Sequence, residues 1–211
     1  MRAGRAAGLL AIAVALGSSP ARAQSFYDAP APGSYALPVI DSVEEHTLLA
    51  HDGKPAPLLG LGERQIAVVS FIYRSCSDAN GCPLALMRLQ TLDRELAKQP
   101  ELAGRVRLVT ASFDPKRDTP ERMAELRGHM SPKSDWRFLT AASRRELAPV
   151  LTDYGQDVAK VIDTSGNETE VLRHVLKVFL IDGEGRVRNI YSNGFLDTRL
   201  VLADIRTLLF P

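Results

Sequence analysis

The sequence predicts an α/β sandwich in which helices flank a central mixed β-sheet and a β-hairpin precedes that sheet. A continuous apolar run rich in β-branched residues, 65–73, is typical of a buried central strand, and 106–113 predicts a second buried strand. A segment with helical features follows each of them. Near the end of the chain, two strand-like runs lie on either side of a glycine-containing turn, and a helical segment closes the sequence. Strands and helices in this order build a layered α/β domain.

The first 23 residues predict a signal peptide. Arg2 and Arg5 supply a positive start, residues 6–16 form an apolar run, and 21–23 read Ala-Arg-Ala, the pattern of a cleavage site. The run is shorter than a bilayer-spanning helix requires, so we expect export to the periplasm with cleavage after Ala23; an uncleaved anchor is the alternative. The periplasm is oxidising, so a thiol pair there forms a disulfide unless it is reduced or bound to metal.

Residues 24–41 are expected to form an extended tether, because Ala, Pro, Ser and Gly predominate there without a hydrophobic period. The remainder, 42–211, fits one domain, since a chain of 211 residues is of ordinary single-domain size. The 26 lysines and arginines balance 25 aspartates and glutamates, and no basic stripe is interleaved with aromatic residues. We therefore expect no nucleic-acid partner.

The first elements of the domain lead to the cysteines. A short hairpin is predicted within 46–61, with its turn at Asp52-Gly53, and the strand 65–73 follows it. A helix is predicted from 83 to about 98, because apolar residues recur on one face and proline suits the first helical position. The cysteine loop therefore joins the end of a buried strand to the start of a helix.

The middle of the chain repeats this alternation. The strand 106–113 precedes a helix that opens near 119–120, and 136–140 is predicted as another strand. A capping box at 143–146 predicts a helix that ends near Gly155, and Pro149 is expected to kink or shorten that helix.

The last part of the chain predicts one strand over 171–182, which carries His174. A turn at 183–185, a strand over 187–192 and a helix capped by Asp197 complete the domain. This order of elements is that of a thioredoxin-like fold. In open α/β sheets functional groups gather at the carboxyl ends of strands, which is where the cysteine loop lies.

Cys76 and Cys82 are the two cysteines of the chain. A disulfide that closes so short a loop contributes only about 2.4 kcal/mol, so a purely structural staple is the weaker interpretation. Cys82 lies at the start of the predicted helix, where the helix dipole favours a thiolate. Thiolates promote both disulfide exchange and soft-metal binding, so a redox pair and a metal site both stay open. Gly81 gives the loop the freedom to bring both sulfurs together.

Histidine would complete a metal site, because two thiolates alone under-coordinate an ion. Of the four histidines, only His174 lies inside a strongly patterned strand, and His46, His51 and His129 are weaker candidates. A lone histidine in an apolar run is more often an ordinary core or surface residue than a ligand. Spacing alone therefore does not assign it to a metal.

Four segments together resemble the Sco/SenC family of thioredoxin-fold copper proteins. They read VVSFIYRSCSDANGCPLALMRLQ, VTASFDPKRDTPERM, DWRFLT and HVLKVFLIDGEGRVRNIYS, in matching order between 42 and 209. The resemblance implies that Cys76, Cys82 and His174 bind copper, as Cu(I) and also as Cu(II), and that Cys76 and Cys82 double as a redox pair. This donor set suits Cu(I), whereas zinc usually takes a fourth ligand.

The resemblance also implies a function and partners. The protein would be an exported metallochaperone that helps to metallate the copper site of cytochrome c oxidase or another periplasmic cuproenzyme, including a membrane-embedded client. A periplasmic thiol reductant would be its second partner, because copper binding needs both cysteines reduced.

The cysteine loop departs from the family pattern. That pattern is CxxxC with proline after the first cysteine, whereas this chain has Ser77 there and two additional residues, most simply Asn80-Gly81. Asp78 matches an acidic residue common in the family loop, and a solvated loop tip explains it better than an oxygen contact to metal. The matching turn at 114–120 is explained by capping and turn chemistry.

Two other functions share the cysteine pair. A thiol–disulfide oxidoreductase that reduces client cysteines needs only Cys76 and Cys82. Ordinary thioredoxins, however, carry CxxC and a proline near the position of His174, and the Pro and Thr expected before a peroxiredoxin cysteine are absent here. A copper or redox sensor would instead show a changed surface to a partner.

Overall fold

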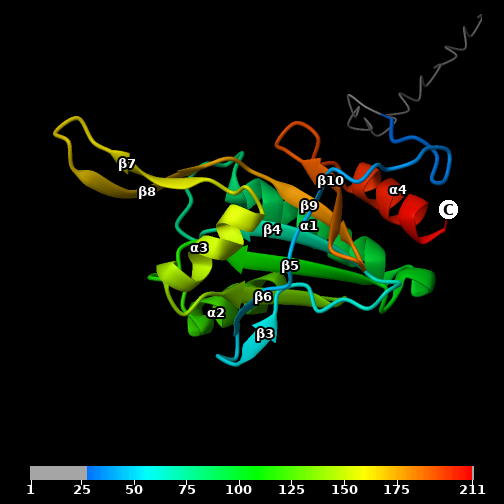
Figure 1. Cartoon of the computed structure of the whole chain (residues 1–211), viewed down its shortest axis with the longest axis horizontal. Coiled ribbons are helices and arrows are strands. Elements are labelled where there is room, and N and C mark those ends of the chain that lie inside the picture. Colours follow the sequence, from blue (N-terminus) through cyan, green and yellow to red (C-terminus); the bar gives the residue numbers. More distant parts are fainter. Residues whose placement is uncertain (1–27, 211) are drawn as a thin grey trace, which may run out of the picture.

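The computed structural model describes residues 28–210, which form an eight-stranded sheet covered by helices and a two-stranded arm that projects from it (Figure 1). The strand order in the sheet is β1-β10-β9-β4-β5-β6-β2-β3. The neighbours β4, β5 and β6 are parallel, and the other pairs are antiparallel. The predicted fold class, a mixed sheet with flanking helices and an N-terminal hairpin, is confirmed.

Apart from the arm, the strands and helices occur in the predicted order. The strands of the sheet are β1 (Asp41–Ser42), β2 (Thr47–Ala50), β3 (Pro55–Pro57), β4 (Ile66–Ile72), β5 (Val106–Ser112), β6 (Trp136–Thr140), β9 (Val178–Asp182) and β10 (Arg186–Tyr191). The arm consists of β7 (Val158–Ile162) and β8 (Glu168–His174). The helices are α1 (Cys82–Ala97), a short 3-10 turn (Pro100–Leu102), α2 (Pro120–Met130), α3 (Arg144–Asp153) and α4 (Thr198–Leu209).

Helices cover both faces of the sheet around β4. Val68 of β4 faces a small space that Leu89 of α1 and Val201 of α4 also line. Phe71 lies three residues later and so on the opposite face of the strand. Its ring packs edge-on against Tyr154, at the end of α3, with ring centroids 5.0 Å apart. α1 and α4 therefore cover one face, and α3 covers the other.

β4 is the central strand that leads to the cysteines. All seven of its residues are buried, and it pairs in parallel with β5 and antiparallel with β9. Strands that are buried on both faces are continuously apolar, which explains the uninterrupted run seen in the sequence. The carboxyl end of β4 opens directly into the cysteine loop, so the loop starts from one of the most rigid parts of the fold.

Side-chain caps start three of the helices. Thr119, Ser143 and Asp197 cap α2, α3 and α4, and in each case the side-chain oxygen accepts a backbone N–H of the first turn. The capping predictions at 143 and 197 are therefore confirmed. α3 continues through Pro149 but is only 10 residues long and ends at Asp153, before the predicted end.

The single strand predicted over 171–182 is wrong. β8 ends at His174 and pairs with β7, whereas β9 begins at Val178 and pairs with β4 and β10. Apolar residues predominate on both sides of 175–177, but the chain changes pairing partner there. Gln156 Nε2 donates to Val175 O at 3.1 Å, which fixes the path of the chain between the two strands.

The arm formed by β7 and β8 is only partly predicted, because the predicted strand over 171–182 covers the second half of β8 and no predicted element covers β7. Its side chains alternate, so that Leu172 is buried while Val171 and Ile162 are 51% and 54% exposed. Within the described residues, the arm forms its own two-stranded sheet and pairs with no strand of the main sheet. The arm projects from one end of the domain (Figure 1). Side chains such as Arg117 and Gln156, which donate to Glu170 O and Val175 O, connect its base to the domain.

The described part of the predicted tether, 28–41, contacts the domain, and its last residue already belongs to β1. Gly33 N–H donates to Thr207 Oγ1 at 3.0 Å, and the Tyr35 hydroxyl donates to Asp204 Oδ1 at 2.5 Å, both on α4. The predicted signal peptide lies outside the described residues, and the domain boundaries stay predictions. Among the described helices, none combines the length and apolarity needed to cross a membrane.

Candidate metal centre

Cys76 and Cys82 lie in the loop that follows β4. Cys82 is the first residue of α1 and is 2% exposed, and the Tyr73 N–H donates to its Sγ at 3.4 Å. Cys76 is half-buried, and its N–H donates to Tyr73 O at 3.2 Å. Both thiols are free. The backbone of Tyr73 therefore holds both ends of the loop at the carboxyl end of β4.

His174 is the last residue of β8, and its imidazole points towards Cys82. Nε2 lies 3.5 Å from Cys82 Sγ, and Nδ1 lies 3.0 Å from Leu172 O. A carbonyl oxygen only accepts hydrogen bonds, so Nδ1 carries the proton of the neutral ring and Nε2 keeps its lone pair. The nitrogen that faces the sulfurs is therefore the one able to bind a metal.

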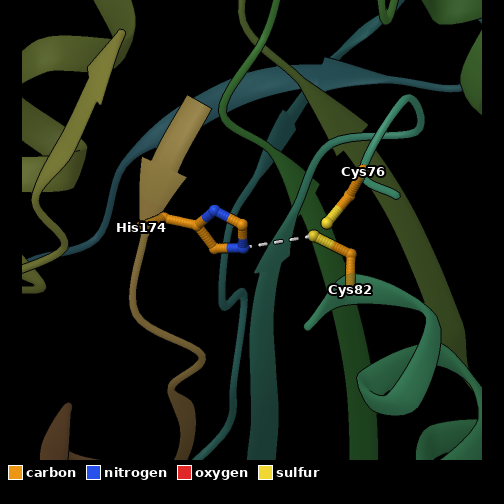
Figure 2. A group of neighbouring side chains, drawn as sticks. All are labelled: Cys76, Cys82 and His174. Carbon is orange, nitrogen blue, oxygen red and sulfur yellow. Dashed lines mark hydrogen bonds between the residues drawn. The ribbon is translucent and has the colours of Figure 1, made fainter. Parts of the chain in front are cut away.

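The three side chains form one cluster, in which both sulfurs and the imidazole face the same point (Figure 2). Their ligand atoms all lie within 4.8 Å of one another. The structure thus brings together the three residues whose ligand role is predicted, although the cysteine loop and His174 are far apart in the sequence. His46, His51 and His129 are not in the cluster, and His46 Nε2 instead pairs with Asp153 Oδ2 at 2.9 Å.

The lengthened part of the loop is a compact turn. Asn80 N–H donates to Asp78 Oδ1 at 3.0 Å, and Gly81 N–H donates to Asp78 O at 2.9 Å. The Asp78 carboxylate thus stabilises the turn and is not part of the metal-type cluster. A Cβ atom on Gly81 would lie 3.3 Å from both Asp78 O and Asp78 Oδ2, closer than an ordinary contact. Glycine at this position therefore suits the compact turn around Asp78.

The electrostatic environment of Cys82 corrects one expectation. Its place at the start of α1 predicts a stabilised thiolate, yet burial raises the pKa of the Cys82 thiol well above its ordinary value, and the Tyr73 N–H lowers it only in part. The prediction is wrong because desolvation outweighs the helix dipole. In the metal-free protein Cys82 is a neutral thiol at pH 7, and binding of a metal cation must release its proton.

The deeper burial of Cys82 and its raised pKa predict that the two cysteines react at unequal rates. In the reduced, metal-free protein at pH 7, we expect iodoacetamide to alkylate Cys76 at least about ten times faster than Cys82, because only thiolates react and Cys82 is buried and protonated. Mass spectrometry of timed samples measures both rates. The raised pKa makes the Cys82 rate keep rising above about pH 9.5, where the rate of an ordinary thiol with a pKa of about 8.5 has levelled off. Equal rates in the folded protein would contradict this expectation, and equal rates in denaturant are the control.

Aromatic residues around His174 were missed by the sequence analysis. The rings of Phe113 and Tyr73 lie with their centroids 4.9 Å and 5.4 Å from that of the imidazole. They restrict the rotation of the ring and exclude water from its faces. The available signal was position: both aromatic residues directly follow central strands, at the edge of the sheet where functional groups gather.

The fold and the cluster define a class of protein, a thioredoxin-like domain with a Cys-Cys-His group at the carboxyl end of its central strand. The SCO1/SenC family model matches residues 40–209, and the chain belongs to this family. The resemblance seen in the sequence motifs is thereby confirmed. A search of curated proteins finds no significant match to the sequence.

Solved structures of the same fold include several Sco proteins. The Thermus thermophilus apo Sco1 protein is 24% identical, with a TM-score of 0.67 and coverage of 86% of this chain and 98% of its own. A SCO1/SenC family lipoprotein from Bacillus anthracis is 25% identical, with a TM-score of 0.65 and coverage of 81% and 96%. Bradyrhizobium japonicum ScoI with copper bound is 23% identical, with a TM-score of 0.60 and coverage of 77% and 97%. These likenesses show the fold.

Proposed function

We propose that this protein is an exported copper-binding assembly factor that carries copper on Cys76, Cys82 and His174 and delivers it to a periplasmic cuproenzyme such as cytochrome c oxidase. The observation that carries the proposal is the cluster itself, in which two sulfurs and one imidazole nitrogen lie within 4.8 Å of one another. Family membership and the copper-bound state of the Bradyrhizobium relative support copper as the metal.

The donor set fits Cu(I). Thiolate sulfur is a soft ligand that selects Cu(I), and imidazole binds copper as well. Cys82 Sγ and His174 Nε2 are 3.5 Å apart, so both can lie at a bonding distance of about 2.0–2.3 Å from one ion. The neutral tautomer of His174 already directs its lone pair at this point. Binding needs only the loss of the thiol protons to solvent.

The unequal burial of the cysteines supports delivery. Cys82 is buried at the start of α1, whereas Cys76 is half-buried beside the exposed loop residues 77–80. A client ligand can therefore reach the metal from the side of Cys76, and an ion with three ligands can accept an incoming ligand before it releases one. Copper would then leave by ligand exchange, without any change in the oxidation state of the metal or the cysteines.

Export places the protein beside such clients. The signal-peptide pattern supports a periplasmic location: it has arginines near its start, an apolar run and an Ala-Arg-Ala cleavage site. In that oxidising compartment the free pair Cys76 and Cys82 would close into a disulfide, so a thiol reductant must act before each round of copper loading. A related protein, BsSco, is described as a member of the Sco family of cytochrome c oxidase assembly proteins, which supports that client class.

The test measures Cu(I) binding to the reduced mature domain in the presence of a competing chelator such as bicinchoninate. We expect about one Cu(I) per wild-type chain. His174→Ala should bind at least about tenfold more weakly, because loss of a ligand costs no less than loss of a group that orients one. Mixing the loaded protein with the soluble copper domain of an oxidase, followed by separation and metal analysis, tests delivery.

The outcome also separates the proposal from its rival. Equal and weak Cu(I) binding by wild type and His174→Ala would refute the three-ligand site and favour a thiol–disulfide oxidoreductase that uses Cys76 and Cys82 alone. His46→Ala is the matched control, since His46 pairs with Asp153 away from the cluster, and it should bind Cu(I) as the wild type does.

A further inference from the structure

The strand that carries His174 depends on side chains for its position. Within the described residues, β7 and β8 pair only with each other, and His174 is the last residue of β8. A two-stranded hairpin is at most marginally stable by itself. The cysteines, in contrast, follow a strand at the centre of the main sheet. The distance from His174 to the sulfurs therefore depends on contacts between β8 and the rest of the domain.

Arg117, in the turn between β5 and α2, makes a two-point polar contact to β8. Its Nη1 donates to the backbone oxygen of Glu170 at 3.2 Å, and its Nη2 forms an ion pair with the Glu170 carboxylate. Glu170, Leu172 and His174 alternate along β8 and so lie on the same face of the strand. The guanidinium thus holds β8 at Glu170, two residues before Leu172 and four residues before His174.

A buried carboxylate orients the guanidinium. Asp114 is 1% exposed, and its Oδ2 lies 3.1 Å from Arg117 Nη1. Arg144 approaches the other oxygen of this carboxylate only at 3.9 Å. The planar guanidinium can contact Asp114 and both acceptors of Glu170 together, whereas a lysine ammonium, a single point charge, cannot span them.

The same turn holds the cysteine loop. Asp118 Oδ2 accepts the Arg74 N–H at 3.0 Å, two residues before Cys76, and it also accepts the Ser112 hydroxyl at 2.6 Å. Phe113, at the start of the turn, contacts the His174 ring. One turn, residues 113–119, therefore touches the segment of the first cysteine through Asp118 and the strand of the histidine through Arg117, while it supplies no ligand.

We infer that the 113–119 turn sets the geometry of the metal centre, and that Arg117 is a positioning residue that acts through His174. This inference rests on the proposed copper-binding function and adds to it a residue outside the three ligands. The turn gives the buried Asp114 and Asp118 a role beyond the capping and turn chemistry that the sequence suggests.

The test compares Arg117→Lys with the wild type. Lysine keeps a positive charge beside Asp114, so the melting temperature should change little, but the link to Glu170 is lost. We expect Cu(I) affinity, measured by bicinchoninate competition, to fall about tenfold, as for other groups that orient a metal ligand. Lys160→Met is the matched control, because the Lys160–Glu168 ion pair lies within the arm and does not reach the domain. It should bind Cu(I) as the wild type does.

A double-mutant cycle distinguishes positioning from general damage. If Arg117 acts through His174, Arg117→Lys should cause no further loss of Cu(I) affinity when His174 is already alanine. An equal loss in both backgrounds would overturn the inference, as would wild-type affinity in Arg117→Lys. If wild type and His174→Ala bind Cu(I) equally, the proposed function itself fails, and this result is distinct from the others.

A measurement without metal tests the same inference. The order parameter of the His174 ring, from carbon-13 relaxation in the reduced apo protein, should be lower in Arg117→Lys than in wild type or Lys160→Met. An unchanged order parameter would show that the aromatic contacts alone hold the ring, and would overturn the role of Arg117.

Discussion

Replacing Cys82 with serine is expected to reduce the Cu(I) affinity by more than about a hundredfold, a larger loss than for any other substitution considered. Groups that merely orient a ligand contribute about 10- to 100-fold to metal affinity, and Cys82 is one of only two soft ligands in the cluster. A serine hydroxyl is a hard donor that stays protonated at neutral pH. The variant would leave Cys76 and His174 as a two-ligand site.

Serine is the informative replacement because it preserves the local fold. Cys82 is 2% exposed, and its Sγ accepts the Tyr73 N–H, a hydrogen bond that a serine oxygen can also accept. The melting temperature of the apo protein should therefore stay close to that of the wild type. Chelator competition measures the affinity, and Ser77→Ala in the same loop is the control. Wild-type affinity in Cys82→Ser would remove Cys82 from the proposed site.

Replacing Asp204 with alanine is expected to destabilise the domain by about 3 kcal/mol, because it leaves buried donors without an acceptor. Asp204 on α4 is 1% exposed. It accepts the Tyr191 hydroxyl at 2.6 Å and Asn189 Nδ2 at 2.7 Å, both on β10, and the Tyr35 hydroxyl at 2.5 Å. For a domain of this size, the melting temperature should fall by about 6–12 °C.

Calorimetry or thermal circular dichroism measures this loss. Asp204→Asn keeps one acceptor oxygen and should be intermediate, whereas Glu95→Ala removes only the exposed ion pair with Lys98 and should stay within about 0.5 kcal/mol. Burial, and then the charge of Asp204, raises the pKa of Tyr191. The unfolded state therefore loses that proton first, and wild-type stability should decline above about pH 10. A melting temperature unchanged in Asp204→Ala would contradict the expectation.

The sheet was predictable because its central strands carry a strong local signal. β4 and β5 are buried on both faces, so their sequences are predominantly apolar, and the caps at Ser143 and Asp197 are short-range motifs. The arm was not predictable in this way. Residues 171–182 form one predominantly apolar segment, yet the first part pairs with β7 and the second with β4. Hydrophobic periodicity contains no information about pairing partners.

The candidate site was predictable in its residues but not in its environment. The family motifs predicted Cys76, Cys82 and His174 as the ligands, and the fold brings these side chains into one cluster. The upward shift of the Cys82 pKa was not predicted, because the start of the helix can be recognised in the sequence whereas the degree of burial cannot. The same holds for Arg117: its partner Glu170 lies 53 residues further along the chain, and no local pattern connects them.

The position of the N-terminal segment affects how the metal centre is oriented when the protein is attached to a surface. Residues 28–40 run beside α4, at the end of the molecule opposite to the arm and remote from the cysteine loop (Figure 1). A copy attached to a surface through its N-terminus would consequently direct its thiols outwards into solution. Such a copy offers a natural format for binding experiments, in which a partner meets the metal centre without obstruction from the support.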